Sequence, residues 1–321
     1  MAFIFPFFTA FIITYIFVPL TRKIAFRYQV VDMPNQRKIH VDPIPLLGGL
    51  AIFIGFGMTV FLYVAVTPKM LSMFIAGSLV LCIGIIDDWA KAHGRDFPML
   101  PKLLVQVIAA MVLVYGGYQI TGIFGIAFAE QTAWFFPSWL GVVLTVLWIV
   151  GLMNVLNFLD GMDGLATGIA AISSMTLFFI ALIQGQIILA LLCIALLGTT
   201  LGFLKYNFHP AKIFMGDAGA LFLGCILAAI SIEGAFKGAT LLTLVVPLLV
   251  FGVPIFDTAY VMFRRWREKR PIYVADKGHL HHRLMGIGLS QIQAVTFIYI
   301  VGICFSLLSL VIVLFVVLGS V

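Results

Sequence analysis

Long apolar segments separated by short polar loops make up almost the whole chain. Each segment has roughly the 20 residues that a helix needs to cross the hydrocarbon core of a bilayer. With 63% hydrophobic and 10% charged residues, the chain is far from a soluble domain, which is about half apolar and a quarter charged. We therefore predict an all-α, polytopic integral membrane protein with one domain, residues 1–321. Its ten expected spans are 3–21, 46–66, 70–86, 102–120, 139–157, 164–183, 186–204, 218–235, 239–261 and 291–318.

Both ends of the chain carry apolar segments. The first has no charge before Arg22 and no convincing cleavage site, so we expect a spanning helix and not a removed signal peptide. The last run, from Ile292 to Val321, has no charge and fits either one tilted helix with a tail or two short segments. Runs of this length favour helices over the short alternating strands of a membrane barrel.

The basic residues are divided unevenly between the two faces that these spans define. All of the 19 Lys and Arg residues except Lys69 and Lys237 fall in loops of one face. The positive-inside rule makes that face cytoplasmic and leaves both termini outside. The net charge of +6 then reflects this asymmetry and gives no evidence for nucleic-acid binding. Attraction to anionic lipid is the default role of the cluster from Arg264 to Arg270.

The same face collects acids. Asp87 and Asp88 end the third span, and adjacent carboxylates repel one another unless a cation lies nearby. An ordinary solvated helix end is the alternative interpretation. Lys91 and Lys102 follow in the same loop and would either neutralise the pair or bind a phosphate.

A polar stripe ends the fifth span. Asn154, Asn157 and Asp160 recur at every third position, which places them on one face of a helix, and Asp163 follows in a glycine-containing turn. The alternative is hydrogen bonding between helices by the amides. Because two acids and two amides within ten residues are costly at a membrane boundary, we favour a ligand site.

The loop before the eighth span contains Asn207 and Asp217. Asp217 lies near the expected start of that span, where the helix dipole favours a carboxylate, so a helix cap is one interpretation. A metal ligand close to Asp87 and Asn157 is the other. Oxygen ligands of this kind favour Mg²⁺, or Mn²⁺, over zinc.

A basic segment ends the last loop of this face. Histidine clusters can bind zinc, but this one has neither an accompanying cysteine nor regular ligand spacing. Imidazolium and guanidinium groups also bind phosphates, and we favour that interpretation. The segment comprises His279, His281, His282 and Arg283.

The first loop adds a basic stretch with Arg37, Lys38 and His40, which alone is typical of a juxtamembrane loop. Taken in order, the five loops resemble the polyprenyl-phosphate N-acetylhexosamine-1-phosphate transferases, the glycosyltransferase 4 or MraY superfamily. The stretches 34–40 and 279–283 resemble its WecA/TagO-like branch, which uses UDP-N-acetylglucosamine (UDP-GlcNAc). The MraY branch has a longer histidine run followed by an acid. Members of the WecA/TagO-like branch often have an eleventh span, whereas ten are expected here.

The resemblance implies an enzyme of the bacterial cytoplasmic membrane. It would transfer GlcNAc-1-phosphate from UDP-GlcNAc to undecaprenyl phosphate, giving undecaprenyl-PP-GlcNAc and UMP, the first membrane step of a cell-envelope glycan. Mg²⁺ is the implied cofactor, with Mn²⁺ as an alternative. Three other functions stay open: MraY-type transfer of phospho-MurNAc-pentapeptide, an intramembrane prenyltransferase and a transporter of anionic sugars. Lys91 interrupts the DDxxD spacing of prenyltransferases, and transporters place polar groups near the bilayer midplane.

The resemblance also implies roles for residues. Asp217, with Asn157 beside it, would hold Mg²⁺ on the diphosphate, and Asp87, assisted by Asp88, would position or deprotonate the lipid phosphate. The implied substrate-binding residues are Lys91 and Lys102 for the lipid phosphate, His281, His282 and Arg283 for the diphosphate, Asp160 and Asp163 for the uridine, Arg37, Lys38 and His40 for the amino sugar, and Asn154, Asn207 and His279 without a more specific contact.

Small residues recur at helical spacing in the sixth and seventh spans. Gly164 with Gly168 and Gly198 with Gly202 are spaced for close helix packing. The contacts that they make would lie either within the chain or between the subunits of a homodimer.

Overall fold

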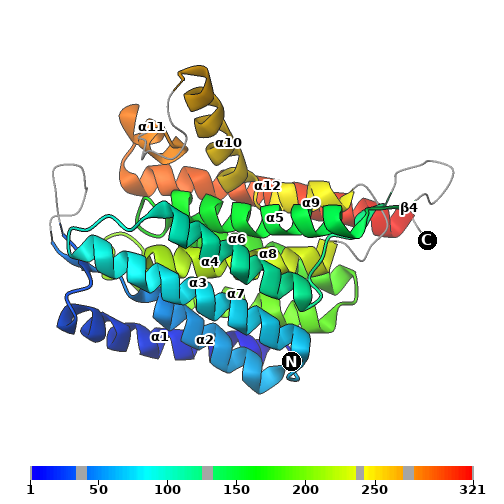
Figure 1. Ribbon diagram of the computed structural model, residues 1–321, viewed down its shortest axis with the longest axis horizontal. Helices are drawn as coiled ribbons and strands as arrows, with labels where there is room; N and C mark the ends of the chain where they lie inside the picture. The colour runs from blue at the N-terminus through cyan, green and yellow to red at the C-terminus, as the bar shows by residue number, and fades with distance from the viewer. Residues whose placement is uncertain (1, 34–41, 125–132, 236–241, 270–277, 320–321) are drawn as a thin grey trace.

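Twelve helices form in the residues that the computed structural model describes, which are 2–33, 42–124, 133–235, 242–269 and 278–319 (Figure 1). Most of them run nearly antiparallel to their chain neighbours, as short loops between long helices require. The helices are α1 (Ile4–Arg27), α2 (Gly48–Tyr63), α3 (Pro68–Ala92), α4 (Met99–Tyr115), α5 (Ser138–Leu159), α6 (Leu165–Ile183), α7 (Ile187–Asn207), α8 (Gly216–Ala235), α9 (Leu242–Val250), α10 (Gly252–Arg267), α11 (Leu280–Gly286) and α12 (Gln291–Gly319).

Seven of these helices are long and apolar enough to cross a membrane, namely α1, α3, α5, α6, α7, α8 and α12. Two shorter helices, α2 and α4, are also apolar. The predicted all-α, polytopic membrane fold is therefore confirmed. The predicted number of ten spans is not confirmed.

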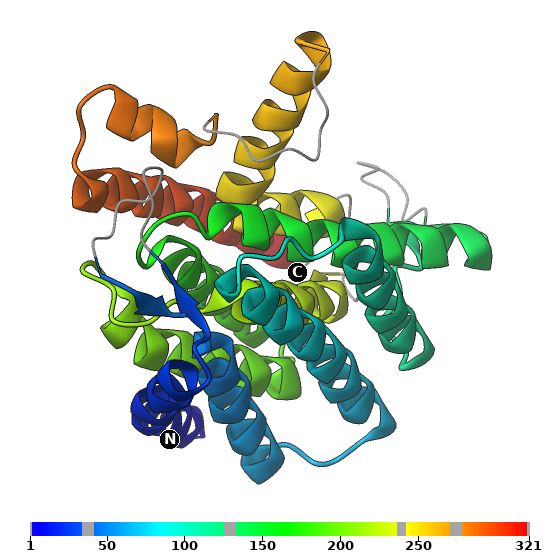
Figure 2. The same cartoon turned by 60° about the vertical axis from the view of Figure 1, so that its left-hand side comes forward.

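The expected span 239–261 is not one straight helix. Its described part forms α9 and α10, which are separated at Phe251, where φ is −103° and ψ is 23°. Pro247 lies within α9 and Pro254 in the first turn of α10. A proline has no backbone N–H to donate and clashes with the preceding turn, so the pair explains the break. Figures 1 and 2 show that α10 projects out of the bundle.

The C-terminal apolar run forms a single helix, α12, of 29 residues. It packs along α6 and α9. The sequence allowed either one tilted helix or two short segments, and the structure has one long helix.

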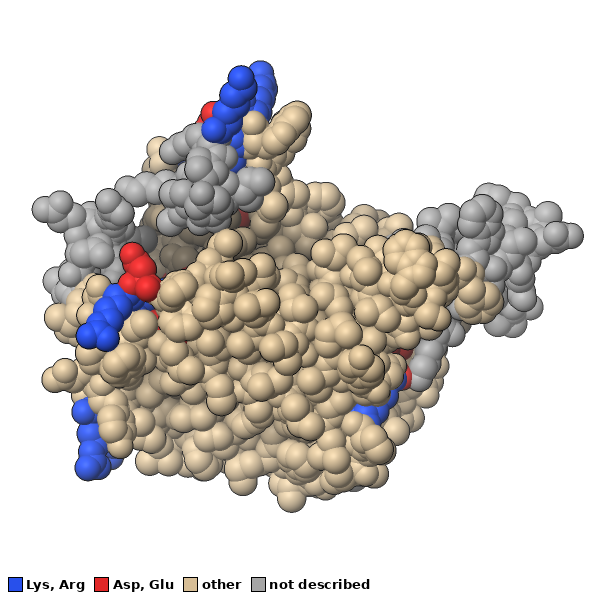
Figure 3. Space-filling model, in the orientation of Figure 1, with Lys and Arg blue, Asp and Glu red and all other residues tan. Residues whose placement is uncertain are grey.

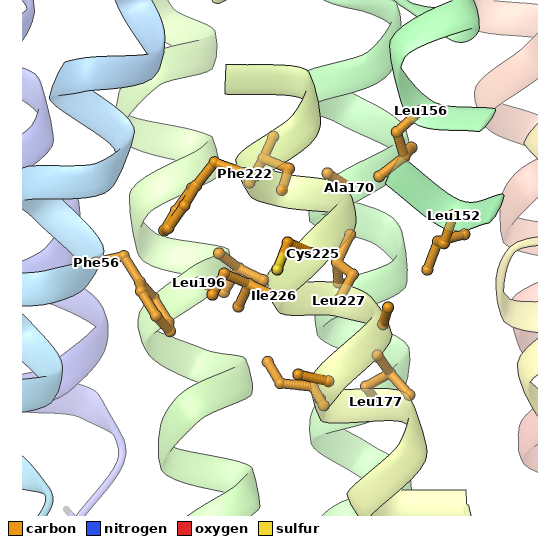
Figure 4. Close-up of a cluster of buried hydrophobic side chains, with 14 of the residues drawn as sticks. Phe56, Leu152, Leu156, Ala170, Leu177, Leu196, Phe222, Cys225, Ile226 and Leu227 are labelled. Carbon is orange, nitrogen blue, oxygen red and sulfur yellow. The ribbon is translucent and has the colours of Figure 1, made fainter. Parts of the chain in front are cut away.

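The centre of the bundle is α8. Phe222, Cys225, Ile226 and Leu227 have no exposed surface, and Figure 4 shows them surrounded by side chains of neighbouring helices. Helices α2, α3, α5 and α6 all pack against α8. A helix that is apolar on every side is stable only when it is enclosed in this way. The start of α8 is therefore held firmly by its neighbours.

The recurring glycines pack helices within the chain. A Cβ at Gly198 would lie 2.3 Å from the Phe7 carbonyl oxygen of α1, and one at Gly168 would lie 2.1 Å from the Tyr299 ring of α12. These close approaches require glycine. The sequence allowed these glycine contacts either within the chain or between subunits, and the contacts of Gly168 and Gly198 lie within the chain.

Two short antiparallel strand pairs were not predicted from the sequence. They are β1 (Val31–Asp32) with β2 (Ile44–Pro45), and β3 (Gly122–Phe124) with β4 (Ala133–Phe135). The Phe214 amide donates to the Pro45 carbonyl oxygen over 2.8 Å, so the first loop is tied to the segment that enters α8.

The polar loops lie together at one end of the bundle. In Figure 1 the end of α1, the start of α4 and α11 lie at the end opposite to both chain termini. Figure 3 shows most visible Lys and Arg side chains at that end and on the projecting helix α10. The fold thus brings together loops that are far apart in the sequence, as predicted.

Candidate active site

A cavity of about 670 Å³ lies at the loop end of the bundle. That volume is within the usual range for small-molecule sites, roughly 300–1,000 Å³. Its walls come from α1, the β1–β2 segment, the end of α3, the α5–α6 turn, the α7–α8 loop and the α11–α12 region. Seven of the residues predicted for the site line it: Asp88, Lys91, Asn157, Asp160, Asp163, Asp217 and His282.

Two carboxylates beside this cavity share two ammonium groups. Lys91 Nζ lies 2.9 Å from Asp217 Oδ2 and 3.3 Å from Asp87 Oδ2. Lys102 Nζ lies 2.7 Å from Asp87 Oδ2 and also pairs with Asp217. The carboxylates come from α3 and α8, and each lysine contacts both of them. The arrangement brings two acidic oxygens within reach of one cation.

Asp88 makes different contacts from its neighbour Asp87. Its Oδ1 accepts the Asp217 amide over 2.9 Å and its Oδ2 accepts the Ala218 amide over 3.2 Å. A buried carboxylate of α3 thus caps the first turn of α8. Asp217 itself pairs its carboxylate with the two lysines, so Asp88 and not Asp217 caps α8, and the metal-ligand interpretation of Asp217 stays a prediction.

Gly216 makes this cap possible. Its φ is +68°, a conformation that residues with a side chain rarely adopt. A Cβ there would lie 2.3 Å from Asp88 Oδ2 and 2.6 Å from the Leu46 carbonyl oxygen. The glycine in front of Asp217 is therefore required by backbone geometry and by the close approach of α3.

The α5–α6 turn contributes the next two acids. Asp160 follows the last residue of α5, and burial, followed by the nearby charges of Asp217 and Asp163, raises its pKa to about 8. Asp163 Oδ2 accepts hydrogen bonds from His209 Nδ1 over 2.8 Å and from the Ala211 amide over 3.0 Å. Asp163 therefore holds the loop before α8, and it presents less free carboxylate to the cavity than Asp160 does.

Two of the three predicted asparagines, Asn154 and Asn207, hold the scaffold. Asn154 donates to Gln106 Oε1 over 2.6 Å, which joins α5 to α4. Asn207 is buried, accepts from Thr167 and donates to the Ile213 carbonyl oxygen over 3.0 Å. The Asn154 hydrogen bond corresponds to the interhelical alternative considered for the amides of the fifth span.

The histidine segment forms the start of α11. His282 lines the cavity, whereas His281 is buried and its Nδ1 has no hydrogen-bond partner among the described residues. Burial, together with His282 and His279, lowers the pKa of His281 to about 3. His281 is therefore a neutral imidazole at pH 7 and cannot act there as an imidazolium. Arg283 places its guanidinium 4.5 Å from the centre of the Tyr260 ring of α10.

Sequence reasoning assigned no role to five other charged or titratable residues of the cavity wall: Arg22, Asp32, Asp42, His209 and Lys212. His209 and Lys212 belong to the loop that carries Asn207 and Asp217, so their proximity to that motif was a usable signal. Arg22 lies in a long apolar helix, and only the fold brings it to the cavity. The predicted Arg37, Lys38 and His40 lie outside the described residues.

The cavity wall is strongly acidic. Six aspartates line it, against three Lys or Arg residues. In the part of the chain that the structure describes, no group of three His, Cys, Asp or Glu side chains is arranged to hold a metal ion. Two carboxylates that converge on a common cation nevertheless suit Mg²⁺, which commonly takes one or two carboxylates and completes its shell with water and substrate phosphates. Asp217 is one of these carboxylates and Asn157 also lines the cavity, so the predicted ligand pair offers oxygen donors of the kind that Mg²⁺ takes.

Comparison with known proteins identifies the family. The model of the family "Glycosyl transferase family 4" matches residues 70–235, which include Asp87, Asn157 and Asp217. The chain belongs to this family of transferases. The predicted family resemblance is confirmed.

Relatives cover nearly the whole chain. Over 312 residues it is 40% identical to the "probable undecaprenyl-phosphate N-acetylglucosaminyl 1-phosphate transferase" of Bacillus subtilis (strain 168), a match that covers 97% of this chain and 84% of the relative. It is 36% identical to the "decaprenyl-phosphate N-acetylglucosaminephosphotransferase" of Mycolicibacterium smegmatis, over 91% of this chain and 77% of the relative. A Salmonella typhi "undecaprenyl-phosphate alpha-N-acetylglucosaminyl 1-phosphate transferase" is 29% identical over 88% of this chain and 77% of the relative. These names support the WecA/TagO-like branch.

Proposed function

We propose that this membrane protein transfers GlcNAc-1-phosphate from UDP-GlcNAc to undecaprenyl phosphate and releases UMP, as the first membrane step of a cell-envelope glycan. The observation that carries the proposal is the pair of carboxylates, Asp87 and Asp217, that share Lys91 and Lys102 beside the cavity. The names of the bacterial relatives support the same acceptor and sugar phosphate.

The proposed site faces the cytoplasm. The loop end of the bundle carries nearly all of the Lys and Arg residues, which favours a cytoplasmic location by the positive-inside rule. A nucleotide sugar would then arrive from the cytoplasm, while the phosphate of the lipid acceptor lies at the membrane surface beside the ends of α3 and α8.

In the proposed reaction, an oxygen of the lipid phosphate forms a bond to the β-phosphorus of UDP-GlcNAc. The bond from that phosphorus to the bridging oxygen breaks, and UMP leaves with the oxygen. A transfer without an added proton or electron needs positioning and charge stabilisation above all. Transfer in one step and transfer through a covalent intermediate on an aspartate both satisfy this balance.

Mg²⁺, or Mn²⁺ in its place, is the proposed cofactor, held by Asp217 with Asn157 beside it. A bound divalent ion would offset the negative charge of the diphosphate and of the leaving UMP. The acidic wall supports this proposal, because the ionised aspartates among the six would repel a dianionic substrate without added positive charge.

The remaining side chains would act on the substrates directly. Asp87 would position the lipid phosphate, and Lys91 and Lys102 would bind its oxygens. His282 would contact the diphosphate from the opposite wall, and Asp160 would face the uridine. Arg22 and Lys212 add positive charge to the cavity wall, and we extend the substrate-binding set to them.

The test is UMP release by purified protein in detergent with undecaprenyl phosphate and Mg²⁺. UDP-GlcNAc should support release, and UDP-N-acetylmuramoyl-pentapeptide should not. The opposite preference would assign MraY-type activity instead. No release with either donor would refute the proposed transfer.

A further inference from the structure

Asp257 is a buried acid that sequence reasoning left without a role. It lies on α10, the helix that projects from the bundle, and its side chain is only 4% exposed. Its Oδ2 lies 2.8 Å from His279 Nδ1, and its Oδ1 accepts the Leu280 amide over 2.7 Å. Both oxygens therefore bind the first turn of α11. A buried carboxylate is costly unless it is paired in this way.

The contact with the backbone caps α11. This helix has only seven residues, and the side chain of its N-cap residue, His279, makes no capping hydrogen bond. A helix this short is unstable alone, and its first amides need acceptors. Asp257 supplies one from a different helix, so the direction of α11 depends on where α10 places this carboxylate.

The contact with the ring determines the tautomer of His279. A carboxylate oxygen only accepts, so the Nδ1 of His279 must carry the proton, and Nε2 of the neutral ring then has a free lone pair. The ring is also held by stacking. It lies parallel to the His281 ring, with centroids 5.8 Å apart, and its centroid is 6.3 Å from that of Phe158 on α5.

His279 is the N-cap residue of α11 and His282 lies in its first turn, so the orientation of this helix sets the position of both rings. His282 lines the cavity. A rotation of α11 would thus move both imidazoles relative to the substrate phosphates. Carboxylates that orient a functional histidine through its second nitrogen have this effect at metal sites, where their loss costs about 10–100-fold.

We propose that Asp257 is a positioning residue that holds His279 in the Nδ1–H tautomer and directs the histidine end of α11 toward the phosphate groups of the nucleotide sugar. The inference rests on the proposed function for the identity of the ligand. The placement of His279 by Asp257 does not depend on it.

Asp257→Asn separates the two contacts. The Leu280 amide can only donate, so the amide oxygen of the new side chain should remain there. Its NH₂ group then faces His279, and the ring must move its proton to Nε2 to accept. We expect kcat/KM for UDP-GlcNAc to fall about 10–100-fold, mainly through KM, with little change in melting temperature. Asp257→Glu should recover part of the loss.

A double-mutant cycle with His279→Gln tests whether Asp257 acts through His279. The effect of Asp257→Asn should be much smaller in the His279→Gln background, because the two residues act as a unit. An equal loss in both backgrounds would overturn the proposal. Thr258→Val is the matched control, since Thr258 is the buried neighbour of Asp257 on α10, and it should keep wild-type kinetics.

A second readout does not require transferase activity. In protein labelled with ¹⁵N-histidine, the resonances lost in His279→Gln should report Nδ1–H in the wild type and Nε2–H in Asp257→Asn. An Nε2–H ring in the wild type would overturn the proposal. If the wild type shows the Nδ1–H ring and releases no UMP, the proposed function fails while the placement of His279 by Asp257 stands.

Discussion

Helices α3 and α8 are joined by ion pairs at both ends, and the two pairings differ. At the end opposite to the cavity, Lys69 pairs with Glu233, and its ammonium group lies 4.7 Å from the centre of the Tyr118 ring. At the cavity end, Asp87 and Asp217 share Lys91 and Lys102. The Lys69–Glu233 pair lies away from the cavity and forms a structural contact between the two helices. Two convergent carboxylates beside a cavity form a place where cations can be exchanged.

The largest effect on the cavity end of α3 and α8 is expected from Asp217→Asn. The amide keeps the shape and loses the charge that holds both lysines and the proposed metal ion. We expect UMP release to fall by at least about 10³-fold. The protein should still elute as a single folded species, because Asp88, and not Asp217, caps α8. Activity close to wild type would remove Asp217 from the metal site.

A smaller effect is expected from Gly84→Ala, which alters the spacing of α3 and α8 near the cavity. The new Cβ would lie 2.3 Å from the Ala218 Cα and 2.5 Å from its nitrogen, so one backbone must move. Overpacking of this kind costs about 1–3 kcal/mol, and a shift of about 1 Å in a site can cost about 10²-fold in rate. The melting temperature and the rate of UMP release should both fall.

Gly151→Ala is the matched control for this substitution. Gly151 lies on α5, and a Cβ there would meet nothing within 4 Å. Because alanine favours a helix by about 1 kcal/mol over glycine, the control should be as stable as the wild type or more so. Equal losses of UMP release in Gly84→Ala and Gly151→Ala would mean that the spacing of α3 and α8 does not determine activity.

Asp160 gives a pH-dependent test of the acidic wall. Its pKa is about 8 in the fold, against an ordinary aspartate value of 3.8. Between these values the folded protein binds the additional proton, so its stability should fall as pH rises toward 8, by at most about 1.4 kcal/mol per pH unit. Melting temperatures of metal-free protein between pH 5 and 8 measure this slope. Asp160→Asn should flatten it, and an unchanged slope would assign it to another group.

The smallest effect is expected at the other end of α3 and α8. Lys69→Met removes the ion pair with Glu233 at that end, which is partly exposed, with 34% of the lysine side chain accessible. Such pairs contribute about 0–1 kcal/mol. The melting temperature should drop by a few degrees at most, and UMP release should stay within about twofold of wild type. A large loss of activity would show that the two ends are coupled.

Much of this arrangement could be predicted from the sequence. The apolar runs predicted the helical membrane fold, and the polar motifs predicted which loops meet. The break between α9 and α10 was missed because the apolar run continues across it, although Pro247 and Pro254 were visible signals.

The roles of individual acids were harder to predict, because they depend on contacts between distant residues. Asp87 and Asp88 are adjacent in the sequence, yet only the packing of α3 against α8 separates the partner of two lysines from the cap of α8. Asp257 received no role from the sequence, because its partners on α11 are apparent only in the folded structure.

The most direct test of the difference between the two ends is metal binding. Electron paramagnetic resonance with Mn²⁺ in the presence of UDP-GlcNAc should detect one bound ion that Mg²⁺ displaces, in the wild type and in Lys69→Met alike. Asp217→Asn should lose that signal. Equal Mn²⁺ binding by Asp217→Asn and the wild type would contradict the assignment of the cation site to the cavity end of α3 and α8.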